Sequence, residues 1–168
     1  MAANITYSIN GTLGPILSGS DPLGANGESG VITIVASSTL PPTKTTKTSA
    51  TYTLPAGSIT VVIDGTTYGT TGTSTLEYTF PAAGPDKMVI TTKISVSLTA
   101  KITGTVVGTV SLAKGSFKKA AILKHPTKFA PSPQTLTAAT TSGGAGSQVK
   151  YTALGSSTVL GFGGTASN

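Results

Sequence analysis

Apolar and polar residues alternate through the middle of the chain, from Met88 to Leu112. Apart from Thr92, every even-numbered residue of this segment is apolar or small, and nearly all the odd-numbered ones are Thr, Ser or Lys. A two-residue period places successive side chains on opposite faces of a β-strand. The segment is therefore predicted to be extended, with an apolar face directed into a core and a hydroxyl-rich face directed outward.

A single straight strand of this length does not fit inside the domain. About 25 residues would extend about 80 Å, whereas a compact domain of this size is only about 40 Å across. A two-residue turn would move the apolar side from even to odd positions, yet it stays even. We therefore expect two strands, Lys87 to Ala100 and Thr105 to Leu112, joined by a short connection of odd length or by a corner near Gly104.

Further segments with strand character lie on both sides of this region. They are Ile5–Asn10, Val31–Ala36, Thr48–Leu54, Ile59–Ile63, Thr66–Thr70, Leu76–Phe80, Gln134–Thr141, Gln148–Leu154 and Ser157–Phe162. Asp64-Gly65 separates two of them and is typical of a hairpin turn, where both residues need positive φ. Ser116–Lys124 fits one or two helical turns or a strand, and we expect a strand.

These patterns predict an all-β fold, an antiparallel β-sandwich of the immunoglobulin-like or a related type, with about 8–11 strands and little or no helix. The chain has 168 residues, which is the size of one domain. We expect a single domain over residues 1–168, with residues 30–112 as its core and 113–168 as additional strands and loops.

The phrases YTLPAG and VVIDGTTY lie in Thr/Ser/Gly-rich strands without cysteine. In this style the chain resembles the immunoglobulin-like modules of bacterial surface and fibre proteins, over Val31 to Leu112. The resemblance implies a β-sandwich at a cell surface or in a fibre. It carries no functional residue over to this chain, which also lacks the Cys and Trp of antibody cores.

Composition narrows the range of functions. Charged residues make up 10% of the chain, against about 25% in an ordinary soluble domain, so hydroxyl groups provide most of its polarity. The absence of cysteine excludes disulfides, thiolate metal sites and cysteine nucleophiles. The net charge of +6 comes with lysine alone and no arginine. Because base recognition depends on arginine, we do not expect a nucleic-acid partner.

Candidate chemistry is sparse. The carboxylates are Asp21, Glu28, Asp64, Glu77 and Asp86, and none of them forms an obvious pair for acid–base catalysis. His125 is the single histidine, and no G-x-S-x-G motif accompanies it. We therefore predict no catalytic residue, no metal site and no cofactor, and we expect the protein not to be an enzyme. A hydrolase that uses His125 is the alternative.

Lysines gather in one segment after the long alternation. They are Lys114, Lys118, Lys119, Lys124 and Lys128, and Phe117 and Phe129 lie among them. One interpretation is that they contact a partner or an anionic surface. The other is that they protect an edge strand from unwanted pairing.

The leading functional hypothesis is a non-enzymatic structural protein, a homo-oligomer or polymer that assembles through strand edges or terminal strands into a filament, a layer or a virion component. The contacts would lie at Ile5–Asn10 and Gln148–Phe162. The alternative is a monomeric module that binds a polysaccharide or an anionic surface. Its exposed aromatic platform would be drawn from Tyr7, Tyr52, Tyr68, Tyr78 and Tyr151.

The expected location is extracellular, at a cell surface or in a virion. No basic segment followed by an apolar core marks a signal peptide at the N-terminus. No apolar run reaches the roughly 18 residues of a transmembrane segment.

Overall fold

The computed structural model describes residues 3–95 and 103–168. Within these ranges the chain forms twelve antiparallel strands and one helical turn. In chain order they are β1 (Asn4–Ser18), β2 (Ser29–Ser37), β3 (Lys44–Thr45), β4 (Ser49–Leu54), β5 (Ile59–Ile63), β6 (Thr66–Tyr68), β7 (Thr70–Thr79), β8 (Asp86–Ser95), β9 (Thr103–Leu112), α1 (Lys119–Ile122), β10 (Gln134–Leu136), β11 (Gln148–Ala153) and β12 (Ser156–Ser167).

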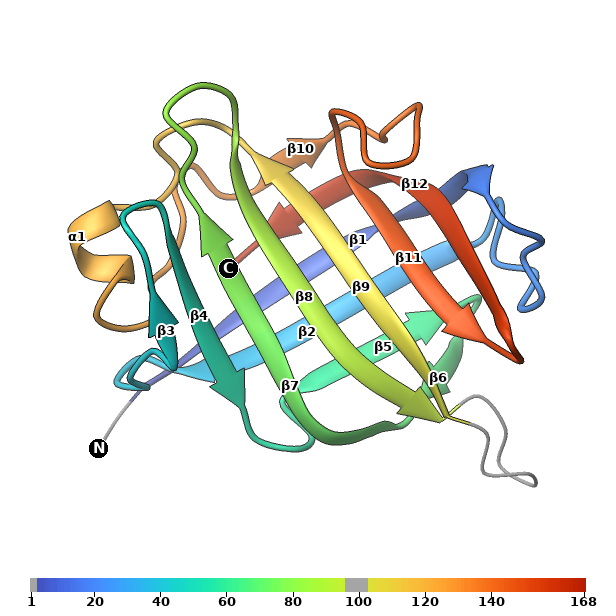
Figure 1. Cartoon of the computed structure of the whole chain (residues 1–168), viewed down its shortest axis with the longest axis horizontal. Coiled ribbons are helices and arrows are strands. Elements are labelled where there is room, and N and C mark those ends of the chain that lie inside the picture. Colours follow the sequence, from blue (N-terminus) through green and yellow to red (C-terminus); the bar gives the residue numbers. More distant parts are fainter. Residues whose placement is uncertain (1–2, 96–102) are drawn as a thin grey trace.

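The strands form one continuous ladder in the order β3-β4-β7-β8-β9-β11-β12-β1-β2-β5-β6, and β10 pairs with β12. Figure 1 shows that this sheet folds over into two layers. β4, β7, β8, β9 and β11 form the front layer, and β1, β2 and β5 run crosswise behind it. β12 belongs to both, because it pairs with β11 in front and with β1 behind.

The predicted all-β, antiparallel fold with little helix is confirmed. The described residues form twelve strands rather than 8–11, and the strand without any predicted counterpart is the two-residue β3. α1 corrects one prediction, since Ser116–Lys124 contains a helical turn instead of a strand. No described helix is long and apolar enough to cross a membrane.

The long alternation forms the hairpin β8–β9 in the front layer. Its partners are even to even, as in Met88↔Val110 and Ile94↔Gly104. The even-numbered residues of both strands are buried, and the odd-numbered ones are partly or fully exposed. This register confirms the predicted phase within the described residues. The end of the predicted first strand, residues 96–100, lies outside the described residues.

Thr92 breaks the apolar pattern of the buried face but is itself buried. Its Oγ1 lies 2.7 Å from Oγ of Ser74, which is also buried, so the two hydroxyls satisfy each other inside the core. A buried hydroxyl without a partner would cost about 1–3 kcal/mol. The hydroxyl of Ser74 on neighbouring β7 therefore explains how Thr92 can lie on the buried face.

Apolar side chains from both layers fill the space between them. Among the largest that are fully buried are Tyr7, Ile9, Ile34, Tyr52, Leu54, Ile59, Leu76, Tyr78, Met88, Ile90, Tyr151 and Phe162. A small hollow beside Leu13 and Phe162 has a volume of only about 10 Å³, which is about the space of one water molecule. The interior in the described part of the chain is thus a packed core.

The two terminal strands lie in the middle of the sheet. β1 pairs with β2 and β12, and it continues to Ser18, beyond the predicted Ile5–Asn10. The glycines of GFGGTA allow β12 to approach β1 closely, because a Cβ on Gly164 would lie 2.0 Å from the Asn10 carbonyl oxygen. Neither terminal strand therefore offers a long free edge.

The predicted Asp64-Gly65 hairpin is confirmed, with φ of 49° and 72°.

The parity of β8 can be tested with two neighbouring substitutions. Ile90→Ala should lower the free energy of unfolding by about 2–5 kcal/mol, because it leaves a cavity in the core. Val89→Ala, one residue away on the outer face, should cost less than about 1 kcal/mol. Urea unfolding followed by circular dichroism measures both, and equal losses would contradict the assigned inner face.

Candidate functional site

The five lysines lie in the segment between β9 and β10, residues 113–133, which we call the cap. The cap contains α1 and lies at one end of the molecule (Figure 1). The cap contacts β4 and β7 of the front layer and β1 of the layer behind it. It therefore closes one end of the space between the layers.

The inner side of the cap is apolar. Phe117, Ile122 and Phe129 are all buried in the core. The Phe117 ring meets the Tyr78 ring edge to face, with centroids 5.0 Å apart, and Phe129 stacks on Tyr7 at 6.0 Å. Aromatic pairs in such geometries contribute about 0.5–1.5 kcal/mol beyond their burial. These side chains explain why a segment with so many lysines folds onto the core.

Two buried tyrosines hold the backbone of the cap. The Tyr7 hydroxyl donates to the Thr127 carbonyl, and the Tyr52 hydroxyl donates to the Ile122 carbonyl. The Tyr7 and Tyr78 hydroxyl oxygens are also 2.6 Å apart. Burial raises the pKa of Tyr7 and Tyr78, and it raises the pKa of Tyr52 to about 12. The contacts therefore use neutral hydroxyls at physiological pH.

Polar side chains from outside the cap fix its first residues. The buried Asp86 carboxylate accepts a hydrogen bond from Gly115 N at 3.1 Å. Gln134 accepts from Ala113 N and donates to Ser116 Oγ, both at 2.9 Å. The sequence pattern placed Gln134 at the start of a strand and linked neither residue to the lysine segment. Asp86 begins β8, whose partner β9 leads into the cap, and Gln134 begins β10, which follows the cap.

The lysines cover the outer side of the cap. Lys114, Lys118, Lys119, Lys124 and Lys128 are all exposed. Lys114 Nζ donates to the Pro81 carbonyl at 2.7 Å. Within residues 3–95 and 103–168, none of the five forms an ion pair with a carboxylate. None of the five lies in a strand.

A hollow of about 190 Å³ opens in the cap between Lys118 and Lys128. Ser116 and Thr127 also line it. The Thr127 hydroxyl oxygen is buried and has no hydrogen-bond partner. The hollow is smaller than the roughly 300 Å³ of a typical small-molecule site, so it suits a single charged group better than a whole ligand of drug size.

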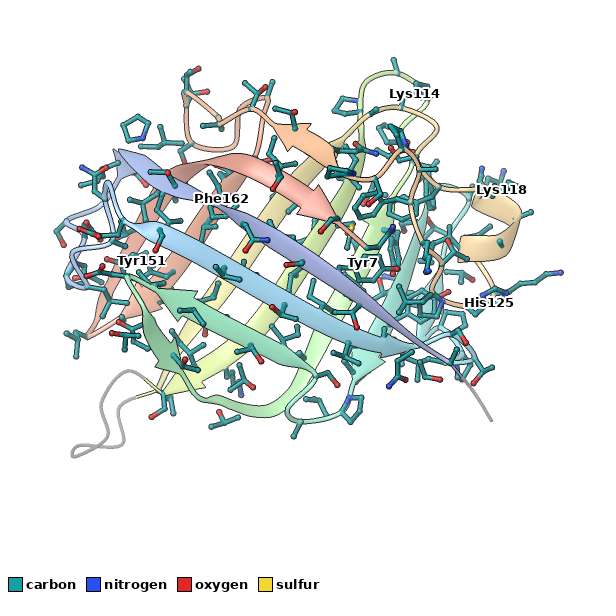
Figure 2. All side chains as sticks on the ribbon, turned by 180° about the vertical axis from the view of Figure 1, so that it is seen from behind. Tyr7, Lys114, Lys118, His125, Tyr151 and Phe162 are labelled. Carbon is teal, nitrogen blue, oxygen red and sulfur yellow. The ribbon has the colours of Figure 1, made fainter. Side chains whose placement is uncertain are left out.

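Carboxylates gather at the other end of the molecule. Asp21 and Glu28 lie in the β1–β2 loop, and Asp64 lies in the β5–β6 turn. Figure 2 shows Tyr151 at this end and Lys114, Lys118 and His125 at the cap. The exposed Glu28 carboxyl forms a hydrogen bond with Asp64, which raises the pKa of Glu28. Three of the chain's carboxylates therefore lie at the end opposite the cap.

Asp21 organises the β1–β2 loop. Its carboxylate accepts hydrogen bonds from the backbone N–H groups of Ala25 and Asn26, both at 2.9 Å, and from the Tyr151 hydroxyl. Burial alone would raise the pKa of Asp21, but these hydrogen bonds outweigh burial and hold the pKa below its ordinary value. Burial and the Asp21 contact raise the pKa of Tyr151 to about 12. Asp21 thus has a structural role in this loop.

His125 is half-buried in the cap, and its Nδ1 lies 3.2 Å from the Pro126 carbonyl oxygen. Glu77 accepts a hydrogen bond from Thr51 on the outer face of the sheet. In the described ranges, no three His, Asp or Glu side chains lie close enough together to hold a metal ion.

The predicted tyrosine platform is wrong. Tyr7, Tyr52, Tyr78 and Tyr151 are each 0% exposed, and only Tyr68 is partly accessible. The two-residue spacing that marked them as strand residues could equally place them inward, and the core takes them. A glycan cannot stack on these four rings without unfolding the protein.

Comparisons of the chain with protein families, with curated proteins and with solved structures find no match. The resemblance to immunoglobulin-like surface modules stays a prediction.

The buried tyrosines make stability sensitive to alkaline pH. Their pKa values are raised by folding, whereas that of an unfolded tyrosine is about 10. Their contribution to the free energy of unfolding is complete below about pH 10 and is lost as the pH rises through about 12. The reason is that tyrosines in the unfolded chain release their hydroxyl protons at lower pH than the buried ones do. We expect phenolate absorbance to rise together with loss of β-sheet circular dichroism.

Tyr52→Phe should weaken this pH dependence and should release the cap for proteolysis, with Tyr68→Phe as the control at a partly exposed position. Full ionisation of tyrosine near pH 10 in a chain that keeps its circular dichroism would contradict the assigned burial.

Proposed function

We propose that the protein is a non-enzymatic binding module that docks onto an anionic polysaccharide through the lysines of the cap. The observation that carries this proposal is the exposure of five lysines on the cap, none of which pairs with a carboxylate among the described residues. A position outside the cell, at a cell surface, fits this partner.

Electrostatics supports an extended anion as the partner. Charges that already pair within the protein contribute little to attraction, whereas these lysines keep their full charge for a ligand. Their attraction extends about 8–10 Å at physiological salt. The hollow beside Lys118 and Lys128 offers a place for one sulfate or carboxylate group.

The cap lysines should therefore control binding. The triple variant Lys118→Gln, Lys124→Gln, Lys128→Gln should bind immobilised heparin about 100-fold more weakly, because each lysine near an anionic surface contributes about 1 kcal/mol. The matched control is Lys44→Gln, Lys47→Gln, Lys93→Gln, which removes the same charge from exposed positions elsewhere. Biolayer interferometry at several salt concentrations measures both.

Equal losses in the two triple variants would contradict the proposal, since net charge alone would then explain binding. Vesicles that contain phosphatidylserine and a DNA duplex are the competing ligands. Tighter binding to either of them than to heparin would assign the cap to a different partner.

Self-assembly into a filament, layer or virion component is the second candidate. It is favoured by the edge of β4, which β3 covers only at Thr51 and Ala50. The short β3 and its Lys44 work against strand addition, because short charged edges discourage pairing. The terminal strands give no long free edge to a second copy, so assembly would use the outer edges of the sheet.

Assembly predicts a species heavier than 16.6 kDa. Size-exclusion chromatography with light scattering, at rising protein concentration, should show larger particles, and electron microscopy should show regular order. A monodisperse monomer at high concentration would remove this candidate and would leave the binding function unaffected.

A further inference from the structure

A second hollow, separate from the cap, lies on the outer face of β9, β11 and β12. Its volume is about 360 Å³, within the range of about 300–1,000 Å³ for sites that bind small ligands. The strand register places its lining residues in rows. Thr109 lies beside Gln148 in one row, and Val107, Lys150 and Val159 form the next. We call this hollow the groove.

One wall of the groove is the loop of residues 142–147. Ser111 fixes this loop, since its backbone N donates to Ser147 Oγ at 3.1 Å and its Oγ donates to the Gly146 carbonyl at 3.0 Å. Gly143 N donates to Gln148 Oε1 at 3.0 Å. This last bond orients the Gln148 amide, so its Nε2 is the group left to donate to a ligand. A wall fixed before binding reduces the entropy lost on binding.

The chemistry of the groove matches a sugar ring with one negative charge. Hydroxyls of Thr109 and Ser157 and the amide of Gln148 can exchange hydrogen bonds with ring hydroxyls. The side chains of Val107 and Val159 offer an apolar floor to the C–H groups of a ring. Lys150 is the one ionisable residue in the described lining, so an anionic group would meet a cation and no carboxylate.

We propose that the groove binds an acidic sugar residue, with the carboxylate on Lys150 and the ring over the two valines. The site shares no residue with the cap and does not depend on the cap's function. It also needs none of the buried tyrosines.

The experiment is an NMR titration of the ¹⁵N-labelled protein with sodium glucuronate, glucose and sodium acetate. Glucuronate should shift the amide of Gly143 and the side-chain amide of Gln148, and should do so at concentrations at least tenfold lower than glucose or acetate. Lys150→Met keeps the aliphatic part of the side chain and should weaken glucuronate binding at least tenfold. Lys93→Met, at an exposed position of β8, is the matched control and should leave binding unchanged.

Three results would overturn the proposal. They are shifts confined to the cap, equal responses to acetate and glucuronate, and no shift at the groove at any accessible concentration. Gln148→Leu provides a second variant, and it should reduce binding of glucuronate while the rest of the spectrum stays folded.

Discussion

The even-to-even register between β8 and β9 determines which side of the whole sheet is buried. Each neighbouring ladder continues it, since Ile90 lies opposite Leu76 of β7 and Val106 lies opposite Tyr151 of β11. Both members of each pair are buried. A slip of one residue would turn the hydroxyl face inward and the apolar face outward. The architecture therefore depends on one phase, repeated from strand to strand through antiparallel pairing.

Once this phase is set, tyrosine rings point into the core and their hydroxyls require partners there. Buried polar groups without partners cost free energy, so the end of the sheet where Tyr7 and Tyr52 meet must be closed by backbone carbonyls. The cap supplies them. Its apolar residues enter the core and its lysines remain in water, so the position of the charged surface follows from the packing beneath it. The lysine surface and the aromatic core are thus two sides of one segment.

Sequence reasoning predicted what depends on local patterns. The alternation at Met88–Leu112 and the Asp64-Gly65 turn each reflect contacts within a hairpin, and both predictions are confirmed. The helical turn at Lys119–Ile122 was missed, because its contacts are distant in sequence, such as the bond from the Tyr52 hydroxyl of β4 to the Ile122 carbonyl. The burial of the tyrosines was missed for a related reason. Period-two patterns show which residues share a face, but only the folding of the sheet decides which face is inside.

The candidate sites show the same division. The lysines of the cap could be named from their spacing in the sequence. The groove could not, because Thr109, Gln148 and Val159 come from three strands whose adjacency depends on the register of β9, β11 and β12. Both surfaces nevertheless arise from one property of the chain. With its apolar residues committed to the core, the outer face keeps hydroxyls, amides and a few lysines, and such a surface offers hydrogen bonds and positive charge with few opposing carboxylates. A ligand with hydroxyls and an acidic group would use both the hydrogen bonds and the positive charge of that surface. A flat apolar partner would use neither.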